Sequence, residues 1–198
     1  MDNNNMMKYK PMLAYPVSTK PIDYNEMVYI QPKLDGVRCL IQCDSGVITA
    51  YSRTGKPWKN IEHILFNLEP FFKFNPDVVL DGELYNHDLR DNFEKIISCV
   101  RKTKPTTVHR LESSGLVRFH CYDVPSNPHK FDVRNEWINL NVPRNFCIHH
   151  VETHEVHAEK YALDLHKIFL NRGYEGSILR LNTEYQCKRS HSLRKFKD

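Results

Sequence analysis

Short apolar runs alternate with amphipathic segments along the chain. Residues 37–43 and 46–51 are rich in β-branched side chains and mostly alternate, and Asp44-Ser45 between them is typical of a hairpin turn. The run that ends at Lys33 is also β-like. Further strands are predicted at residues 78–80, 116–122, 146–150 and 177–181.

Three segments carry apolar residues at helical spacing. The first follows Asn60, a residue type that caps helices, and runs from 61 to 68. The second covers residues 93–100, and the third covers about 155–171, with Gly173 as a C-terminal cap. Strands and helices are mixed without a strict βαβ rhythm. The pattern therefore predicts an α+β fold with two mainly antiparallel β-sheets flanked by helices.

Length and composition limit the domain organisation. With 198 residues and 40% hydrophobic residues, the chain can bury a sizeable core as one domain or two small lobes. Residues 1–10 are polar and predict a flexible N-terminal tail, which leaves residues 11–198 as the folded domain. The net charge of +4 favours anionic partners only mildly.

Cysteine usage and hydropathy indicate the compartment. The six cysteines form no Cys-x-x-Cys pair, so a structural zinc site is not expected. Neither a signal peptide nor an apolar run of membrane-spanning length is present, so no membrane partner is expected. Together these features predict a reducing, cytoplasmic setting.

The most informative cluster is Lys33-Leu34-Asp35-Gly36-Val37-Arg38. Its glycine permits a tight backbone path or the close approach of a ligand. Its charged side chains stand beside the lysine amine, and such neighbours tune the nucleophilicity of an amine. Lys33 is therefore the candidate nucleophile.

Other charged clusters lie at the ends of predicted strands, where loops display functional groups. They are Ser52-Arg53-Thr54-Gly55, Asp81-Gly82-Glu83-Leu84, Glu175-Gly176-Ser177-Ile178-Leu179-Arg180 and Leu193-Arg194-Lys195-Phe196-Lys197. A nucleophile, two separated carboxylates and several cations suit nucleotidyl transfer, because carboxylates bind Mg²⁺ or ribose hydroxyls and cations bind phosphates. Each cluster alone is weak, and their joint occurrence in this order carries the argument.

With Tyr122-Asp123 after a predicted strand as a further element, these motifs resemble the nucleotidyltransferase domain of ATP-dependent DNA ligases. That family belongs to the covalent lysyl-nucleotidyltransferase superfamily, with RNA ligases and mRNA capping enzymes. The resemblance covers nearly the whole chain, from Lys10 to Lys197. It implies an ATP-grasp-like domain that holds the nucleotide between its two sheets.

The resemblance implies that Lys33 attacks the α-phosphate of ATP to give a lysyl-AMP. The attacking amine must be neutral, so the lysine pKa must be lowered or the proton lost on attack. Arg38, Lys195, Lys197 and bound Mg²⁺ would favour the neutral form, whereas Asp35 would oppose it. Arg38 would also contact ribose, the AMP phosphate or the 5′-phosphate of a nick.

The resemblance also implies roles for the other motif residues. Arg53, like Arg38, would contact ribose, the AMP phosphate or the 5′-phosphate of a nick. Glu83 would accept from the ribose 2′-hydroxyl and, with Glu175, would hold the metal. Tyr122 would stack on adenine, and Gln31 is a candidate for the adenine edge. Lys195 and Lys197 would join the arginines as cofactor-binding residues.

The implied partner is nicked duplex DNA. AMP would pass to the 5′-phosphate of the nick, and a 3′-hydroxyl would displace it to seal the strand. Candidate phosphate contacts are Lys56, Lys59, Arg101, Lys102, Lys104, Lys188 and Arg189.

Related ligases continue into an OB-fold domain, which this chain does not contain. We expect an OB-fold domain or subunit to act in trans, or the chain to be an excised catalytic domain. The setting would be the host cytoplasm for a viral or phage enzyme.

Three alternatives remain open at this point. An mRNA-capping guanylyltransferase shares the Lys-x-Asp-Gly-x-Arg element, although Ser52-Arg53-Thr54-Gly55 favours a DNA ligase. An RNA ligase is less favoured, because that group more often lacks the arginine at the position of Arg38. The third alternative is a partner-dependent ligase subunit without autonomous activity.

Overall fold

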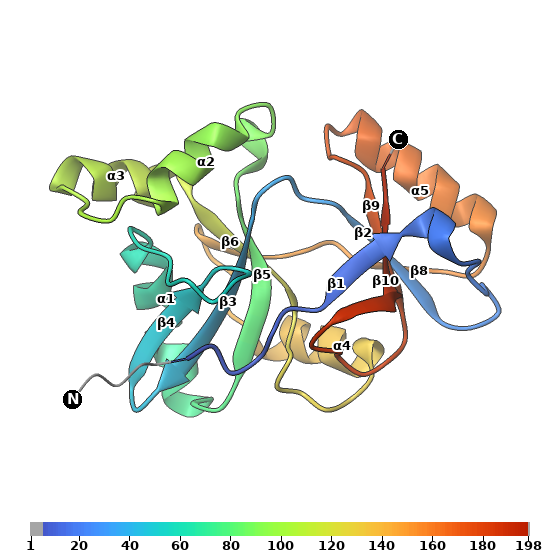
Figure 1. Ribbon diagram of the computed structural model, residues 1–198, viewed down its shortest axis with the longest axis horizontal. Coiled ribbons are helices and arrows are strands. Elements are labelled where there is room, and N and C mark those ends of the chain that lie inside the picture. Colours follow the sequence, from blue (N-terminus) through green and yellow to red (C-terminus); the bar gives the residue numbers. More distant parts are fainter. Residues whose placement is uncertain (1–5, 198) are drawn as a thin grey trace.

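The structure, a computed structural model, describes residues 6–197 and is built on two five-stranded sheets (Figure 1). Sheet A has the strand order β1 (Leu13–Pro16), β10 (Arg189–Phe196), β9 (Ser177–Leu181), β2 (Val28–Pro32), β8 (His154–Val156). All its pairings are antiparallel except that between β1 and β10. It therefore joins strands from the N-terminal and the C-terminal parts of the described chain.

Sheet B is built mostly from the first half of the chain. Its order is β4 (Val47–Tyr51), β3 (Val37–Asp44), β5 (Val79–Tyr85), β6 (Arg118–Asp123), β7 (Ile148–His150). Only β6 and β7 pair in parallel. Two mainly antiparallel sheets with helices confirm the predicted α+β class.

The helices cover the sheets unequally. Helices α1 (Glu62–Phe74), α2 (Phe93–Val100) and α3 (Thr107–Leu116) lie beside sheet B, and α5 (Glu159–Asn171) lies beside sheet A (Figure 1). Helix α4 (Phe131–Asn141) contacts β6. Two short 3-10 turns, Val17–Thr19 and His87–Leu89, complete the elements.

Each sheet has its own apolar core. The larger core joins sheet B to its helices through residues such as Ile41, Leu68 and Phe119. The smaller core packs Val28 and Phe169, among others, between sheet A and α5. Full burial of such a side chain contributes about 1.5–3 kcal/mol. Two separate cores explain why the molecule has two lobes, which leaves a polar junction between them for chemistry.

Two predicted helix starts are wrong. The predicted helix at 155–171 begins at Glu159, because residues 154–156 form β8 and pair with β2. The expected cap Asn60 instead has φ 59°, and helix α1 begins at Glu62. The Asn60 amide donates to the carbonyls of Cys99 and His109, so it joins α1 to α2 and α3.

Part of the predicted N-terminal tail is held against sheet B. Residues 1–5 of that tail, and residue 198 of the predicted domain, lie outside the described residues. Lys8 donates from its backbone to the Gln42 side chain at 2.8 Å and pairs with Asp44 at 3.0 Å. These contacts hold position 8, and the flexibility of residues 1–10 as a whole stays a prediction. No helix within residues 6–197 is both long and apolar enough to span a bilayer.

Candidate active site

A cavity of about 850 Å³ lies between the two sheets. Sheet A contributes residues of β1, β2, β9 and β10, and sheet B contributes residues of β3, β5 and β6. Seven of the predicted site residues line it: Gln31, Lys33, Arg38, Arg53, Glu83, Tyr122 and Lys195. Residues from distant parts of the chain are therefore brought together at one cavity.

Lys33 follows the last residue of β2, and its backbone is tied to the turn before β9. Its N–H donates to the carbonyl of Gly176 at 2.9 Å, and the N–H of Glu175 donates to the carbonyl of Lys33 at 3.2 Å. Gly176 has φ 148°, and a Cβ there would lie 2.1 Å from the carbonyl oxygen of Phe196. Only glycine fits between these strands. The backbone therefore fixes Lys33 beside Glu175.

The Glu175 carboxylate stands between two amines. Its Oε2 pairs with Lys33 Nζ, and its Oε1 pairs with Lys197 Nζ. Burial lowers the pKa of Lys33, while Glu83 and Asp35 raise it. The pKa of the Lys33 amine is lowered, as the resemblance requires, but the main cause is burial and not the neighbouring cations. Asp35 opposes it as predicted.

Glu83 approaches from sheet B and is paired with the aromatic residue of the next strand. Tyr122 Oη donates to Glu83 Oε2 at 3.1 Å. Burial raises the pKa of Glu83 to about 7, against the opposing effect of Arg38 and the tyrosine hydrogen bond. This carboxyl therefore changes charge near neutral pH.

Arg38 lines the cavity, but its guanidinium is engaged by a buried carboxylate. Its Nε and Nη2 each donate to Asp81 at 2.6 Å, and Nη2 also donates to the Met12 carbonyl at 3.0 Å. Tyr185 donates to the same Asp81 carboxylate at 2.7 Å. Arg38 also lies over the Tyr122 ring, 5.3 Å from its centroid. Arg38 therefore forms a fixed part of the cavity wall beside Tyr122.

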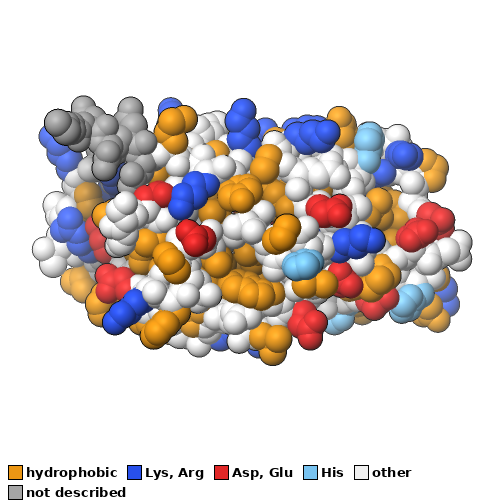
Figure 2. Space-filling model, turned by 90° about the horizontal axis from the view of Figure 1, so that it is seen from below, with side chains coloured by type: hydrophobic (Ala, Val, Ile, Leu, Met, Phe, Trp, Pro, Cys, Tyr) orange, Lys and Arg blue, Asp and Glu red, His pale blue; other side chains and the backbone are white. Residues whose placement is uncertain are grey.

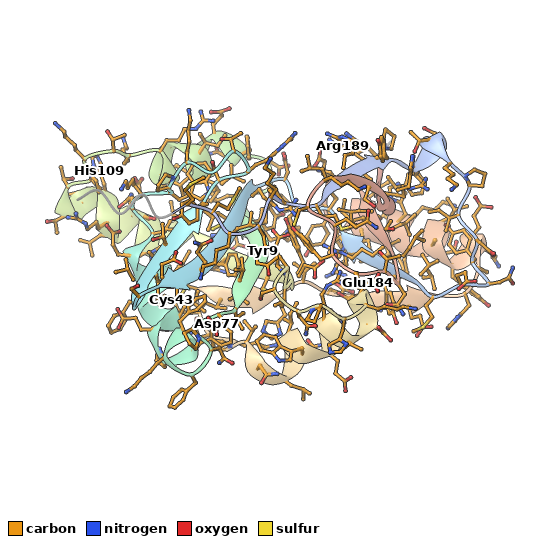
Figure 3. All side chains as sticks on the ribbon, turned by 60° about the horizontal axis from the view of Figure 1, so that its bottom comes forward. Tyr9, Cys43, Asp77, His109, Glu184 and Arg189 are labelled. Carbon is orange, nitrogen blue, oxygen red and sulfur yellow. The ribbon has the colours of Figure 1, made fainter. Side chains whose placement is uncertain are left out.

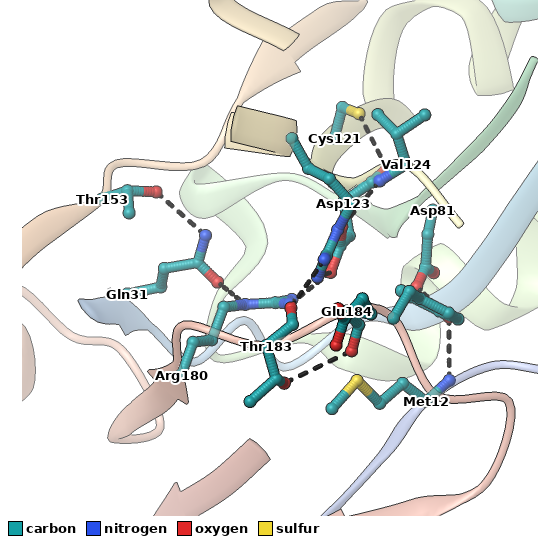
Figure 4. A network of polar contacts seen from close by, with 12 residues as sticks. Met12, Gln31, Asp81, Cys121, Asp123, Val124, Thr153, Arg180, Thr183 and Glu184 are labelled. Carbon is teal, nitrogen blue, oxygen red and sulfur yellow. Dashed lines mark hydrogen bonds and ion pairs between the residues drawn. The ribbon is translucent and has the colours of Figure 1, made fainter. Parts of the chain in front are cut away.

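A second buried network connects the two sheets behind the cavity (Figure 4). The Gln31 amide donates to Thr153 at 2.9 Å and accepts from Arg180 Nε at 2.7 Å. Arg180 continues to Asp123 at 2.5 Å, and Arg134 pairs with the other oxygen of Asp123 at 2.6 Å. Both ends of the Gln31 amide are thus used by protein groups. Its contact with the adenine edge stays a prediction.

The remaining predicted cations are divided between the cavity and other surfaces. Among the expected DNA contacts, four line the cavity: Lys56, Lys59, Arg101 and Arg189. Lys102, Lys104 and Lys188 are not among its lining residues. Arg189 lies at the start of β10 (Figure 3), where its Nη1 donates to the Ala14 carbonyl.

Sequence reasoning assigned no role to Asp81, Asp123, Arg134 or Arg180. All four are buried; Arg180 lines the cavity, and the other three are not among its lining residues. A signal was present, because Asp81 and Asp123 are carboxylates within apolar strands. A buried carboxylate requires a partner, which points to a nearby arginine.

The donor set fits a Mg²⁺ ion. Mg²⁺ is usually bound by one or two carboxylates together with substrate phosphates. Glu83 and Glu175 both lie near Lys33: Glu83 acts on the pKa of this amine, and Glu175 pairs with it. Within residues 6–197, no group of three or more His, Cys, Asp or Glu side chains could hold a metal by itself.

Comparisons with known proteins place this site in a family. Residues 11–197 match the family described as ATP dependent DNA ligase domain. A DNA ligase of African swine fever virus (isolate Tick/South Africa/Pretoriuskop Pr4/1996) is 32% identical over 166 residues, which are 79% of this chain and 37% of that protein. A second isolate (Warthog/Namibia/Wart80/1980) is 33% identical over 159 residues, which are 76% of this chain and 36% of that protein.

Solved structures have the same fold. The structure named Pmar-Lig_PreS3 has a TM-score of 0.77 and 25% identity, over 96% of this chain and 46% of that chain. The bacteriophage T7 ATP-dependent DNA ligase in complex with ATP has a TM-score of 0.73 and 18% identity, over 96% of this chain and 69% of that chain. The chain thus spans little more than a third of the viral ligases that it matches. It belongs to the ATP-dependent DNA ligase domain family.

Proposed function

We propose that this chain is the adenylation domain of an ATP-dependent DNA ligase, with Lys33 as the AMP carrier. Lys33 Nζ attacks the α-phosphorus of ATP, a P–N bond forms, and the bond to the pyrophosphate oxygen breaks as pyrophosphate leaves. The observation that carries the proposal is the Lys33 amine, half-buried at a cavity between two sheets and paired with Glu175.

The surroundings of Lys33 support its activation. Only the neutral amine attacks, and burial lowers the pKa of Lys33 toward the working range. The hydrogen bond from Nζ to Glu175 Oε2 places a carboxylate where the departing proton can be received. Lys197 on the other oxygen limits how strongly that carboxylate stabilises the charged amine.

We assign nucleotide contacts to the cavity lining. Tyr122 would stack on adenine, Glu83 would accept from the ribose 2′-hydroxyl, and Arg53 and Lys195 would contact phosphates. Lys197 is not among the lining residues, but it pairs with Glu175 and would contact phosphates from there. Arg38 would reach the ribose or phosphate from its pair with Asp81. For Gln31 we propose that it holds Arg180 in place.

We propose Mg²⁺ as the metal, held by Glu83 and Glu175 together with ATP phosphates. When bound, it would neutralise charge that develops on the leaving pyrophosphate. The chain's own carboxylates and cations, which alternate around the cavity, would orient the nucleotide.

We further propose nicked duplex DNA as the substrate and an OB-fold domain or subunit as partner. Lys56, Lys59, Arg101 and Arg189 at the cavity are suited to duplex phosphates. The face seen from below carries acidic and basic side chains in mixture, and Lys and Arg gather along the upper edge of the view in Figure 2. The greater length of the viral relatives leaves room for the OB-fold.

Transfer of label from nucleotide to protein tests the adenylation step. The chain is incubated with Mg²⁺ and either α-labelled ATP or α-labelled GTP, and labelled protein is measured after denaturation. We expect label from ATP, and we expect Lys33→Ala and Lys33→Arg to abolish it. Lys160→Ala, on the exposed face of α5, is the matched control and should label normally.

Other outcomes would change the assignment. Label from GTP alone would indicate a capping enzyme. Absence of label that is restored by a separately produced OB-fold would indicate a partner-dependent subunit. Absence of label under both conditions would contradict the proposal. Nicked DNA and a nicked RNA–DNA hybrid, added to the labelled protein, then distinguish DNA from RNA ligation.

A further inference from the structure

His166 is a buried polar residue that the proposed chemistry does not use. It lies on the core face of α5 with Ala162 and Phe169, at spacing that normally carries apolar residues, and is 3% exposed. Its Nδ1 lies 2.8 Å from Ser177 Oγ. Its ring stacks on the Phe196 ring with the centroids 3.7 Å apart and the planes at 4°. The helix thus contacts two strands through one side chain.

Ser177 and Phe196 are the residues at which three strands meet. In sheet A, Ser177 of β9 is paired with Pro32 of β2 on one side and with Phe196 of β10 on the other. Each of the three is one or two residues from a charged group of the site. Those groups are Lys33 after Pro32, Glu175 before Ser177 and Lys197 after Phe196.

The alternation of strand side chains places His166 on the opposite face from the cavity. Ile178 and Lys195 line the cavity, so their neighbours Ser177 and Phe196 face α5. His166 therefore lies behind the sheet, directly beneath the ends of the strands that carry the reacting amine and its carboxylate partner.

We propose that His166 is a positioning residue that fixes the ends of β9 and β10, and so holds Glu175 and Lys197 against Lys33. The inference rests on the proposed function of Lys33. Gly176 has no side chain that could anchor the turn bearing Glu175, so Ser177 is the nearest side-chain anchor in β9. Its hydroxyl is fully buried, and the bond to His166 gives it a fixed direction.

An apolar residue at position 166 would fill the same space without this restraint. Leucine packs in a core but offers no polar atom to Ser177, which would leave a buried hydroxyl without its partner. The strand ends could then shift by fractions of an ångström. Adenylation is sensitive to such shifts, because misplacement of reacting groups by about 1 Å lowers rates about 100-fold.

Single-turnover adenylation of the full chain tests the proposal. His166→Leu and Ser177→Ala should lower the rate constant at saturating ATP about tenfold, with less than about a twofold change in half-saturating ATP. His166→Asn, whose amide stands at the position of Nδ1, should stay within about threefold of wild type. Phe169→Leu is the matched control, because it removes packing from the same core at a residue whose ring contacts are with His154 and Tyr174. It should lower the melting temperature and leave the rate constant unchanged.

A second measurement does not depend on ATP. Competitive acetylation with acetic anhydride, followed by mass spectrometry, compares Lys33 with exposed Lys160 in the same sample. In His166→Leu and Ser177→Ala, Lys33 should become about threefold more reactive, because its amine loses the nearby carboxylate. His166→Asn and Phe169→Leu should match wild type.

The two measurements separate the failure of this inference from that of the proposed function. A wild-type chain that takes no label from ATP, with or without a separately produced OB-fold, refutes the proposed function, and the expected acetylation pattern still supports the positioning role. His166→Leu that matches Phe169→Leu in both measurements overturns the positioning role. The positioning role is also overturned if His166→Asn behaves as His166→Leu does, because the hydrogen bond to Ser177 would then have no effect.

Discussion

Glu175 and Asp123 are each a carboxylate between two cations, yet their surroundings differ. The side chain of Glu175 is 23% exposed, and its partners Lys33 and Lys197 are 21% and 45% exposed. Asp123 is fully buried, and its two arginine partners are 2% and 5% exposed. The same charge pattern thus occurs once at the cavity and once inside the protein.

The difference in burial separates chemistry from structure. Arg134 and Arg180 are always charged, so the Asp123 cluster cannot release a neutral nucleophile. Burial raises the pKa of Asp123, but the two arginines outweigh this effect and hold it below its ordinary value. At the cavity, burial lowers the pKa of Lys33, so this amine loses its proton more readily than an exposed lysine does. A partly exposed lysine pair is therefore suited to reaction, and a buried arginine pair to holding sheets together.

Removal of the buried carboxylate should have the largest effect on stability. Asp123→Asn leaves Arg134 and Arg180 without their charged partner, and loss of one partner from a buried pair costs about 3–5 kcal/mol. Urea unfolding measures this. Glu62→Gln, in the exposed pair with Arg110, is the matched control and should change stability by less than about 0.5 kcal/mol. Equal effects of the two variants would refute a structural role for the buried cluster.

Removal of the cavity carboxylate should affect activity instead. Glu175→Gln should lower the rate constant of adenylation about 100-fold, because the amine loses its proton acceptor. The free energy of unfolding should change by less than about 1 kcal/mol, since this cluster is partly exposed. Label transfer and urea unfolding on the same preparation measure both. A large loss of stability would show that the comparison with Asp123 is wrong.

Glu83 should make stability depend on pH near neutrality. Its pKa is raised from 4.5 to about 7 in the folded state. The folded state therefore holds a proton that the unfolded state has lost, and the contribution is complete below pH 4.5 and lost as pH rises through 7. We expect the free energy of unfolding to fall by about 2–3 kcal/mol across this window. Glu83→Gln should flatten the profile, and an unchanged profile would contradict the raised pKa.

Most strands of the sheets and seven residues that line the cavity could be predicted from sequence because their signals are local. The β-branched alternation of residues 37–51 marks a hairpin, and the charged motifs stand at strand ends. Helix α4 was missed because Arg134 occupies a core position between Phe131 and Ile138, which breaks its apolar stripe. The start of α5 was misplaced because residues 154–156 pair with a strand more than 120 residues earlier.

The buried networks could not be derived because they depend on long-range pairing. Gln31 and Arg180 are 149 residues apart, and they meet only when β2 and β9 lie side by side. The sequence shows that Asp123 needs a partner but does not say which arginine reaches it. Which of the two carboxylates, Glu175 or Asp123, is partly exposed and which is buried therefore follows from the fold and cannot be derived from the sequence alone.

Removal of Lys197 should have the smallest effect of these substitutions, and it tests whether Glu175 needs both of its cations as Asp123 does. Lys197→Ala leaves Glu175 paired with Lys33 alone, and it removes a positive charge whose repulsion favours the neutral amine. The pKa of Lys33 should therefore rise, and the adenylation rate at neutral pH should fall about tenfold. Single-turnover rates between about pH 6 and 9 should show a profile displaced to higher pH, with Lys160→Ala as control. A profile that keeps its position while half-saturating ATP increases would assign Lys197 to phosphate binding alone. The cavity cluster would then act through Glu175 and Lys33 only, whereas the buried cluster needs both of its cations.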